Sequence, residues 1–145
     1  MATVKRTRHC GGNVTALLSV GSNAAGSRLR VEQAMAFAGA RFGALGASAV
    51  FVTPDIRADV IPMMPRAPYA NAVMAVSTPR PPLLAASYLA FNAELKALEH
   101  LLGRRKEHKQ HCLVNIDIDA VTFCGRIMRH VDWLRPYYHP RALTV

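Results

Sequence analysis

The sequence has no long apolar run and few acidic residues. None of its apolar segments approaches the roughly 18–20 residues that a helix needs to cross a bilayer, so we expect no transmembrane helix. Asp and Glu together number nine, against 18 Lys and Arg, which leaves a formal net charge of +9. This imbalance predicts an anionic partner: nucleic acid, an acidic membrane surface or a phosphorylated small molecule.

Cysteines and aromatic residues are also scarce. The three cysteines, Cys10, Cys112 and Cys124, form neither an even set nor a C-x-x-C pair, which argues against a disulfide framework and suits a reducing compartment. Aromatic residues make up 7% of the chain, so an aliphatic core is expected. Basic residues precede the apolar run 14–20, as in a signal peptide, but this run is short and contains hydroxyl side chains. We interpret it as the first strand of a cytoplasmic protein.

The chain length fits one domain with a single core. Residues 1–12 are predicted to form a flexible basic leader, and residues 13–145 a single domain. Periodicity and turn residues predict these elements: strand 14–20, helix 27–42, strand 47–52, strand 69–77, a helix that Pro81 and Pro82 open and Gly103 ends, and strand 114–119. This βαββαβ order predicts an α+β fold, a ferredoxin-like sandwich with helices on one face of an antiparallel sheet.

The second predicted helix carries one continuous apolar stripe. Its large side chains recur at intervals of four and three residues, at Leu84, Tyr88, Phe91, Leu95, Leu98 and Leu102. Residues at this spacing lie on one face of a helix, so we expect the stripe to pack into the core.

Two segments between the predicted elements are expected to close over substrates. Segment 55–68 contains three prolines and no periodicity, and a loop of this length is more often a lid than a simple connection. Segment 104–112 is polar and basic. Its His108, His111 and Cys112 resemble zinc ligands, but no second ligand pair accompanies them, so a substrate-covering loop is the favoured interpretation.

Asp117 and Asp119 are the candidate metal ligands. In a strand, residues i and i+2 point to the same face with Cα atoms roughly 6.5–7 Å apart. We expect Ile116 and Ile118 to face the core, which turns both carboxylates outward together. Adjacent carboxylates repel one another unless a cation lies between them, and hard oxygen ligands select Mg²⁺. The alternative is an ordinary solvated strand face.

A cluster of cations precedes the acidic pair by about a dozen residues. Arg104, Arg105, Lys106 and Lys109 follow directly after Gly103. Cations that face carboxylates suit a complex of polyphosphate with Mg²⁺, because the metal and the basic side chains neutralise different phosphate oxygens. The sequence contains no P-loop motif and no aromatic RNA-recognition motif.

These motifs resemble the 6-hydroxymethyl-7,8-dihydropterin pyrophosphokinase family. The matching segments are LLSVGSN at 17–23, VTP at 52–54, PYANAV at 68–73, Glu99-x-x-x-Gly103-Arg104, and IDID at 116–119. They occur in the family's order at compatible spacing and cover about residues 14–123. The resemblance implies transfer of pyrophosphate from ATP to the pterin hydroxyl, with release of AMP, as part of folate biosynthesis.

The resemblance also implies roles for particular residues. Asp117 and Asp119 would hold two Mg²⁺ ions with ATP, and Arg104 and Asp119 are the candidate catalytic residues. The residues implied for ATP are Glu99, Arg104, Lys106, Tyr138, His139 and Arg141. The residues implied for the pterin are Gly21, Thr53, Pro54, Tyr69 and Asn71.

The sequence departs from the family pattern in three places. Val114 stands where family members carry a second arginine, residues 136–140 match the family's Pro-His motif only loosely, and the chain stops at Val145, before the family's closing strand. Lys109 or Arg105 would compensate for Val114, and Arg141 for an arginine that family members carry beyond this point. The second aromatic wall of the pterin pocket would come from Tyr137, Tyr138 or Trp133. One alternative therefore stays open, a non-catalytic or acceptor-altered relative that binds Mg-nucleotide. The expected partners are ATP and the pterin, without nucleic acid or membrane, and a basic nucleic-acid binder with salt-sensitive affinity is the least favoured interpretation.

Overall fold

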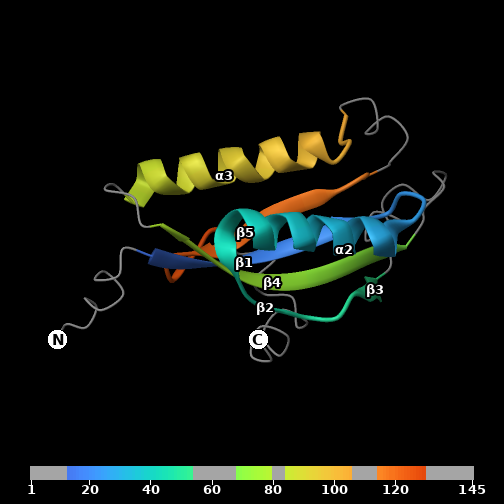
Figure 1. The fold of residues 1–145 in the computed structure, drawn as a ribbon, viewed down its shortest axis with the longest axis horizontal. Coiled ribbons are helices and arrows are strands. Elements are labelled where there is room, and N and C mark those ends of the chain that lie inside the picture. Colours follow the sequence, from blue (N-terminus) through green and yellow to red (C-terminus); the bar gives the residue numbers. More distant parts are fainter. Residues whose placement is uncertain (1–12, 54–67, 80–83, 106–113, 130–145) are drawn as a thin grey trace.

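A computed structural model describes residues 13–53, 68–79, 84–105 and 114–129 of the chain (Figure 1). Its elements are β1 (Asn13–Ser22), α2 (Ser27–Ala38), the π-helical turn η1 (Gly39–Gly43), β2 (Ala44–Ala47), β3 (Phe51–Thr53), β4 (Tyr69–Pro79), α3 (Leu84–Leu101), β5 (Asp117–Phe123) and β6 (Arg126–Ile127). All strand pairs are antiparallel, and the six strands form one sheet in the order β2-β4-β1-β5-β6, with β3 also paired to β4. The predicted leader, residues 1–12, lies outside the described residues.

Both helices cover the same face of this sheet. In β1 and β4 every second side chain is buried in one cluster with apolar residues of α2 and α3, and Figure 1 shows the two helices on one side of the strands. The rings of Phe91 and Phe123 pack 5.2 Å apart where α3 meets β5. The predicted α+β class, antiparallel sheet and one-sided helices are therefore confirmed, as is burial of the α3 stripe from Tyr88 to Leu102.

The prediction of one strand over 47–52 was wrong. β2 and β3 both pair with β4, but the segment between them leaves the ladder at Ser48. The Ser48 hydroxyl accepts a hydrogen bond from the Val73 amide at 2.9 Å, and the Ser48 amide donates to the Val73 carbonyl at 2.8 Å. A serine side chain thus takes the place of a backbone partner, which interrupts the regular strand.

The predicted start of the last strand at residue 114 was also wrong, since β5 begins at Asp117. The Val114 amide donates to Asn23 Oδ1 at 2.6 Å, and the Val114 carbonyl accepts from the Asn23 amide at 3.0 Å. Asn115 is buried and donates to the Leu102 carbonyl at 3.2 Å. Residues 114–116 therefore bond to the end of β1, the β1–α2 turn and the end of α3, and they form no ladder with β1.

Gly103 ends α3 as predicted. Its φ of 104° is left-handed, the Gly103 amide donates to the His100 carbonyl, and the Arg104 amide donates to the Glu99 carbonyl, both at 3.0 Å. This pair of bonds is the Schellman motif, which favours glycine at that position. It directs the chain from α3 towards β5 and holds Arg104 beside the first residues of that strand.

Replacing Gly103 with alanine should destabilise the protein by about 2–3 kcal/mol. The positive φ strains any Cβ there, and the added atom would lie 2.8 Å from Asn115 Nδ2. Gly26→Ala is the matched control, because Gly26 has a φ of 71° but open space around it, so only the strain of about 1 kcal/mol applies. Urea denaturation measures both costs, and equal losses in the two variants would contradict the predicted contact.

Neither described helix combines the length and the apolar character that crossing a bilayer requires. The chain turns from β5 to β6 through Cys124 and Gly125, whose φ values of 52° and 77° suit a two-residue hairpin turn. Cys124 carries a free thiol, as predicted, while Cys10 and Cys112 lie outside the described residues.

Candidate metal and anion site

The candidate site lies at the outer edge of β5. Among the described residues, the neighbour of this edge is the end of α3 and not another strand. β6 pairs only with Thr122 and Phe123, so within the described residues the first part of β5 has no strand on that side. The Ile118 amide donates to Glu99 Oε2 at 2.7 Å, and the Ile118 carbonyl accepts from Lys96 Nζ at 3.1 Å. Side chains of α3 thus satisfy backbone groups that a neighbouring strand would otherwise bond.

Three carboxylates meet at this edge. Oxygen atoms of Glu99, Asp117 and Asp119 all lie within 4.8 Å of one another. Glu99 is 4% exposed and Asp119 is 8% exposed, whereas Asp117 is half-buried. The predicted core positions Ile116 and Ile118 are buried, so the two aspartates do share the opposite face, as expected. The expectation that Asp119 points into solvent was wrong, because α3 packs against the strand edge and covers it.

Three cations surround this acidic triad. Lys96 Nζ lies 2.9 Å from Glu99 Oε2 and 3.0 Å from Asp119 Oδ1. Arg104 Nη1 lies 2.8 Å from Asp117 Oδ1 and 3.3 Å from Glu99 Oε1, and Arg129 Nη1 lies 3.8 Å from Asp119 Oδ1. Among the described residues, three formal positive charges therefore face three negative ones.

The sequence predicted Arg104 beside the acids but missed Lys96 and Arg129. A signal for Lys96 was available, since it precedes Glu99 by three residues and such residues are neighbours on a helix surface. Arg129 follows the β5–β6 hairpin, which the sequence analysis did not find, so no comparable signal existed. The described bonds of Val114 come from its backbone.

The surroundings shift the proton affinities of the site. Burial raises the pKa of Asp119 above the usual range of an aspartate, and the neighbouring Asp117 adds to the rise through a hydrogen bond and its negative charge. Lys96 and Arg129 oppose this rise only in part. Burial lowers the pKa of Lys96, but Asp119 and Glu99 outweigh that effect, so its pKa lies above the usual value of a lysine. Lys96 therefore stays charged throughout the range in which Asp119 titrates.

The raised pKa of Asp119 predicts a pH-dependent stability. The folded state binds this proton more tightly than the unfolded state, so the stabilising contribution is fully present below the usual aspartate pKa. It is lost as the pH rises through the raised folded value. We therefore expect the free energy of unfolding of Asp119→Asn, relative to the wild type, to increase as the pH rises through this window. Urea denaturation in EDTA at several pH values measures this difference, and a constant difference would contradict the prediction.

The described residues predicted for the pterin, which are all of that set except Pro54, lie on the same sheet face as the two aspartates. Gly21 pairs with Asn71 of β4 on one side and with Asp117 of β5 on the other. Neighbouring strands are about 4.8 Å apart, so Asn71 and Asp117 stand about 10 Å apart across β1. Asn71 Nδ2 donates to Thr53 Oγ1 at 2.7 Å, and Thr53 pairs with Tyr69. The structure thus brings Gly21, Thr53, Tyr69 and Asn71 together.

Gly21 is buried, and its lack of a side chain lets Asn71 and Tyr69 approach β1 closely. A Cβ at this position would lie 3.1 Å from Asn71 Oδ1 and 3.7 Å from Tyr69 Cδ2. Figure 1 shows the ends of β1 and α3 and the starts of β4 and β5 at one end of the sheet. The described residues of the five motif segments therefore lie together at this end of the sheet.

Several predicted site residues lie outside the described residues. They are Pro54, Lys106, Tyr138, His139 and Arg141. Residues 55–67 of the predicted covering loop, His108, His111 and Cys112 of the second loop, and Lys109, Trp133 and Tyr137 also lie outside them. Their roles stay predictions.

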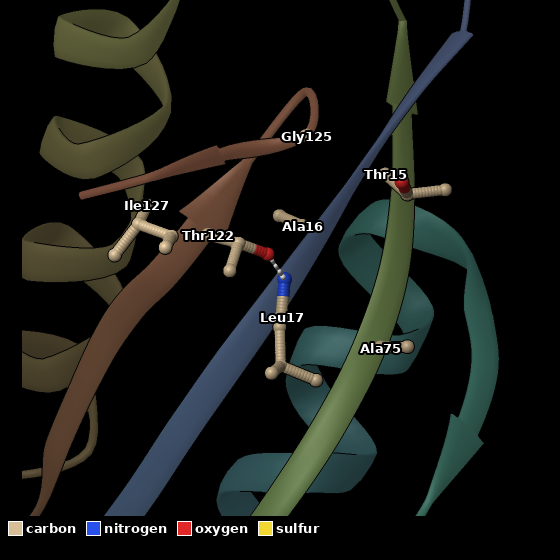
Figure 2. A pocket seen from close by; sticks show the side chains of 7 residues that line it. All are labelled: Thr15, Ala16, Leu17, Ala75, Thr122, Gly125 and Ile127. Carbon is tan, nitrogen blue, oxygen red and sulfur yellow. Dashed lines mark hydrogen bonds between the residues drawn. The ribbon is translucent and has the colours of Figure 1, made fainter. Parts of the chain in front are cut away.

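A separate hollow of about 420 Å³ opens on the sheet further along β1 (Figure 2). It is lined by Thr15, Ala16, Leu17, Ala75, Thr122, Gly125 and Ile127. Thr122 Oγ1 accepts a hydrogen bond from the Leu17 amide at 3.2 Å. None of these described lining residues is charged, so they do not supply the groups that a polyphosphate requires.

The donor set of the triad fits a hard cation. Its ligand atoms are all carboxylate oxygens, which Mg²⁺ and Ca²⁺ prefer. Around an octahedral Mg²⁺, neighbouring ligand oxygens lie about 3 Å apart and opposite ones about 4.2 Å. The three carboxylate oxygens lie within 4.8 Å of one another, so they would bind one ion after their side chains rotate inward. Fold and site together define an α+β protein whose buried acidic triad can hold a metal ion. Comparison with protein-family models gave no match, and a search of curated proteins gave none either.

Proposed function

We propose that this protein transfers pyrophosphate from ATP to 6-hydroxymethyl-7,8-dihydropterin and releases AMP. The observation that carries the proposal is the strand register that places Asn71, Gly21 and Asp117 in one row on the sheet face opposite the helices. The residues that resemble the family's pterin and metal ligands come from distant parts of the sequence, and they meet at one end of the sheet. We also propose that the fold is ferredoxin-like and that the enzyme is cytoplasmic.

The described side chains suit the two substrates in different ways. Tyr69 offers an aromatic surface for a flat pterin, and the Asn71 amide has both donor and acceptor atoms for its edge. Arg104 stands beside the acidic triad, where a guanidinium can hold phosphate oxygens. Two Mg²⁺ ions bound with ATP at Asp117 and Asp119 would neutralise further phosphate oxygens during bond breaking.

In the proposed reaction the pterin hydroxyl oxygen attacks the β-phosphorus of ATP. The bond from that phosphorus to the oxygen that bridges to the α-phosphorus breaks, and AMP leaves with the electron pair. Asp119, which lies beside Lys96 and Arg129, accepts the hydroxyl proton. Arg104 stabilises the charge that develops on the phosphate oxygens, while the sheet holds the two reactants in line.

The test is incubation of the full chain with ATP, MgCl₂ and the pterin, followed by nucleotide chromatography. We expect AMP and pterin pyrophosphate in equal amounts. ADP as the sole product, or no turnover with any pterin alcohol, would reject the proposal. Omission of the pterin controls for simple ATP hydrolysis.

The ion pairing within the site favours a second candidate function, a protein that binds Mg-nucleotide without turning it over. Three side-chain cations already balance the triad, as they would in a purely structural polar cluster. This candidate predicts that Mg-ATP raises the melting temperature by mass action while no AMP forms.

A further inference from the structure

Lys96 occupies the space between two of the three carboxylates. Its ammonium contacts three oxygen atoms at 2.9–3.1 Å: Glu99 Oε2, Asp119 Oδ1 and the Ile118 carbonyl. Both carboxylates are almost fully buried, so the ammonium is the principal counter-charge at their contact atoms. Three converging oxygens form the kind of coordination that a small cation also uses.

The other two cations of the site are placed differently. Arg104 Nη1 contacts Asp117 Oδ1 and Glu99 Oε1, the carboxylate oxygen of Glu99 that Lys96 does not contact. Arg129 lies 3.8 Å from Asp119 Oδ1, outside hydrogen-bond distance. Lys96 alone among them hydrogen-bonds to both buried carboxylates.

The Lys96 side chain is able to leave this position. It is 42% exposed, against 5% for Glu99 and 11% for Asp119 in the same ion pairs. A lysine on a four-carbon stem can turn its ammonium into water, whereas the two carboxylates stay buried at the strand edge. A divalent cation that replaced the ammonium would keep the carboxylates neutralised.

We infer that Lys96 is a built-in competitor for divalent metal, with its ammonium holding the cation position between Glu99 and Asp119. The inference rests on the divalent-cation site of the proposed function and adds a regulatory element to it. A metal ion gains both carboxylates only when Lys96 swings away, so Lys96 weakens metal binding in the absence of nucleotide. In the metal-free protein, Lys96 prevents the repulsion of adjacent buried carboxylates.

The test is Mn²⁺ affinity, measured by electron paramagnetic resonance and checked by the Mn²⁺-dependent shift in melting temperature. Lys96→Met should bind Mn²⁺ at least about tenfold more tightly than the wild type, because the competing charge is gone. Without metal, Lys96→Met should melt at a lower temperature than the wild type. Addition of Mn²⁺ should then raise the melting temperature of Lys96→Met by more than it raises that of the wild type. Lys96→Gln retains a donor for the Ile118 carbonyl and serves as a milder second variant.

Two control variants separate competition from the general effect of charge. Arg129→Met also removes one positive charge near Asp119, but should change the affinity by less than about threefold, since Arg129 does not fill the position. Lys96→Arg keeps the charge and should stay within about threefold of the wild type. Unchanged or weaker binding in both Lys96→Met and Lys96→Gln overturns the inference, as do equal gains in Lys96→Met and Arg129→Met.

The failure of this inference is distinguishable from the failure of the proposed function. If no AMP forms while the Lys96 variants still gain Mn²⁺ affinity, the reaction is rejected and the competition stands. If AMP forms but those variants gain no affinity, the competition is rejected and the reaction stands. Absence of Mn²⁺ binding in every variant rejects the metal site and with it the competition.

Discussion

Replacing Asp119 with asparagine is expected to lower the rate of AMP release by about 1,000-fold or more, which corresponds to about 4 kcal/mol of transition-state stabilisation. Asp119 is buried between Asp117, Lys96 and Arg129, and it is both the proposed base and a proposed metal ligand. An amide of nearly the same size cannot accept the proton and offers a much weaker ligand. The rate is measured by chromatography of AMP at saturating ATP and pterin.

The fold of the Asp119→Asn variant should survive, because the asparagine oxygen can still accept the hydrogen bond from Lys96. Circular dichroism and the melting temperature check this. Glu32→Gln removes one negative charge from an exposed position in α2 and is the control for a general effect of charge. A rate within tenfold of the wild type for Asp119→Asn would remove Asp119 from the proposed chemistry.

Substitution of Glu99 is expected to have the largest effect on stability. Glu99 is 4% exposed, accepts the Ile118 amide at 2.7 Å, and pairs with both Lys96 and Arg104. Glu99→Gln retains an acceptor for the amide but leaves both cations short of a partner, so we expect a loss of about 2–3 kcal/mol. Glu99→Leu also leaves the Ile118 amide without a bond, which raises the expected loss to about 3–5 kcal/mol.

The matched control for Glu99 is Glu94→Gln in the same helix. Glu94 pairs with Arg41, but both side chains are exposed, at 40% and 61%. Exposed ion pairs contribute little, so the free energy of unfolding should change by less than about 0.5 kcal/mol. Denaturation in urea gives all three values. Similar losses in Glu94→Gln and Glu99→Gln would show that Glu99 does not organise the strand edge.

Local patterns in the sequence predicted much of this fold. The helix stripe through Phe91 and Leu95 and the glycine that ends α3 depend on neighbours within a few residues, and both are confirmed. The shared face of Asp117 and Asp119 follows from the two-residue repeat of a strand. Errors arose where a partner came from a distant segment. Ser48 bonds to Val73 and Val114 bonds to Asn23, and neither contact has a local signal.

The sequence by itself therefore determined the class of fold, the main helix and strand positions, and the pairing of two acids on one strand face. These features follow from short-range periodicity and turn chemistry. Only the tertiary structure decided that Asp119 is buried, that Glu99 completes a triad, and that Lys96 and Arg129 join Arg104 around it. The physical reason is that an open strand edge accepts whichever side chains the neighbouring helix presents. That choice depends on how α3 packs against β5, which no local pattern encodes.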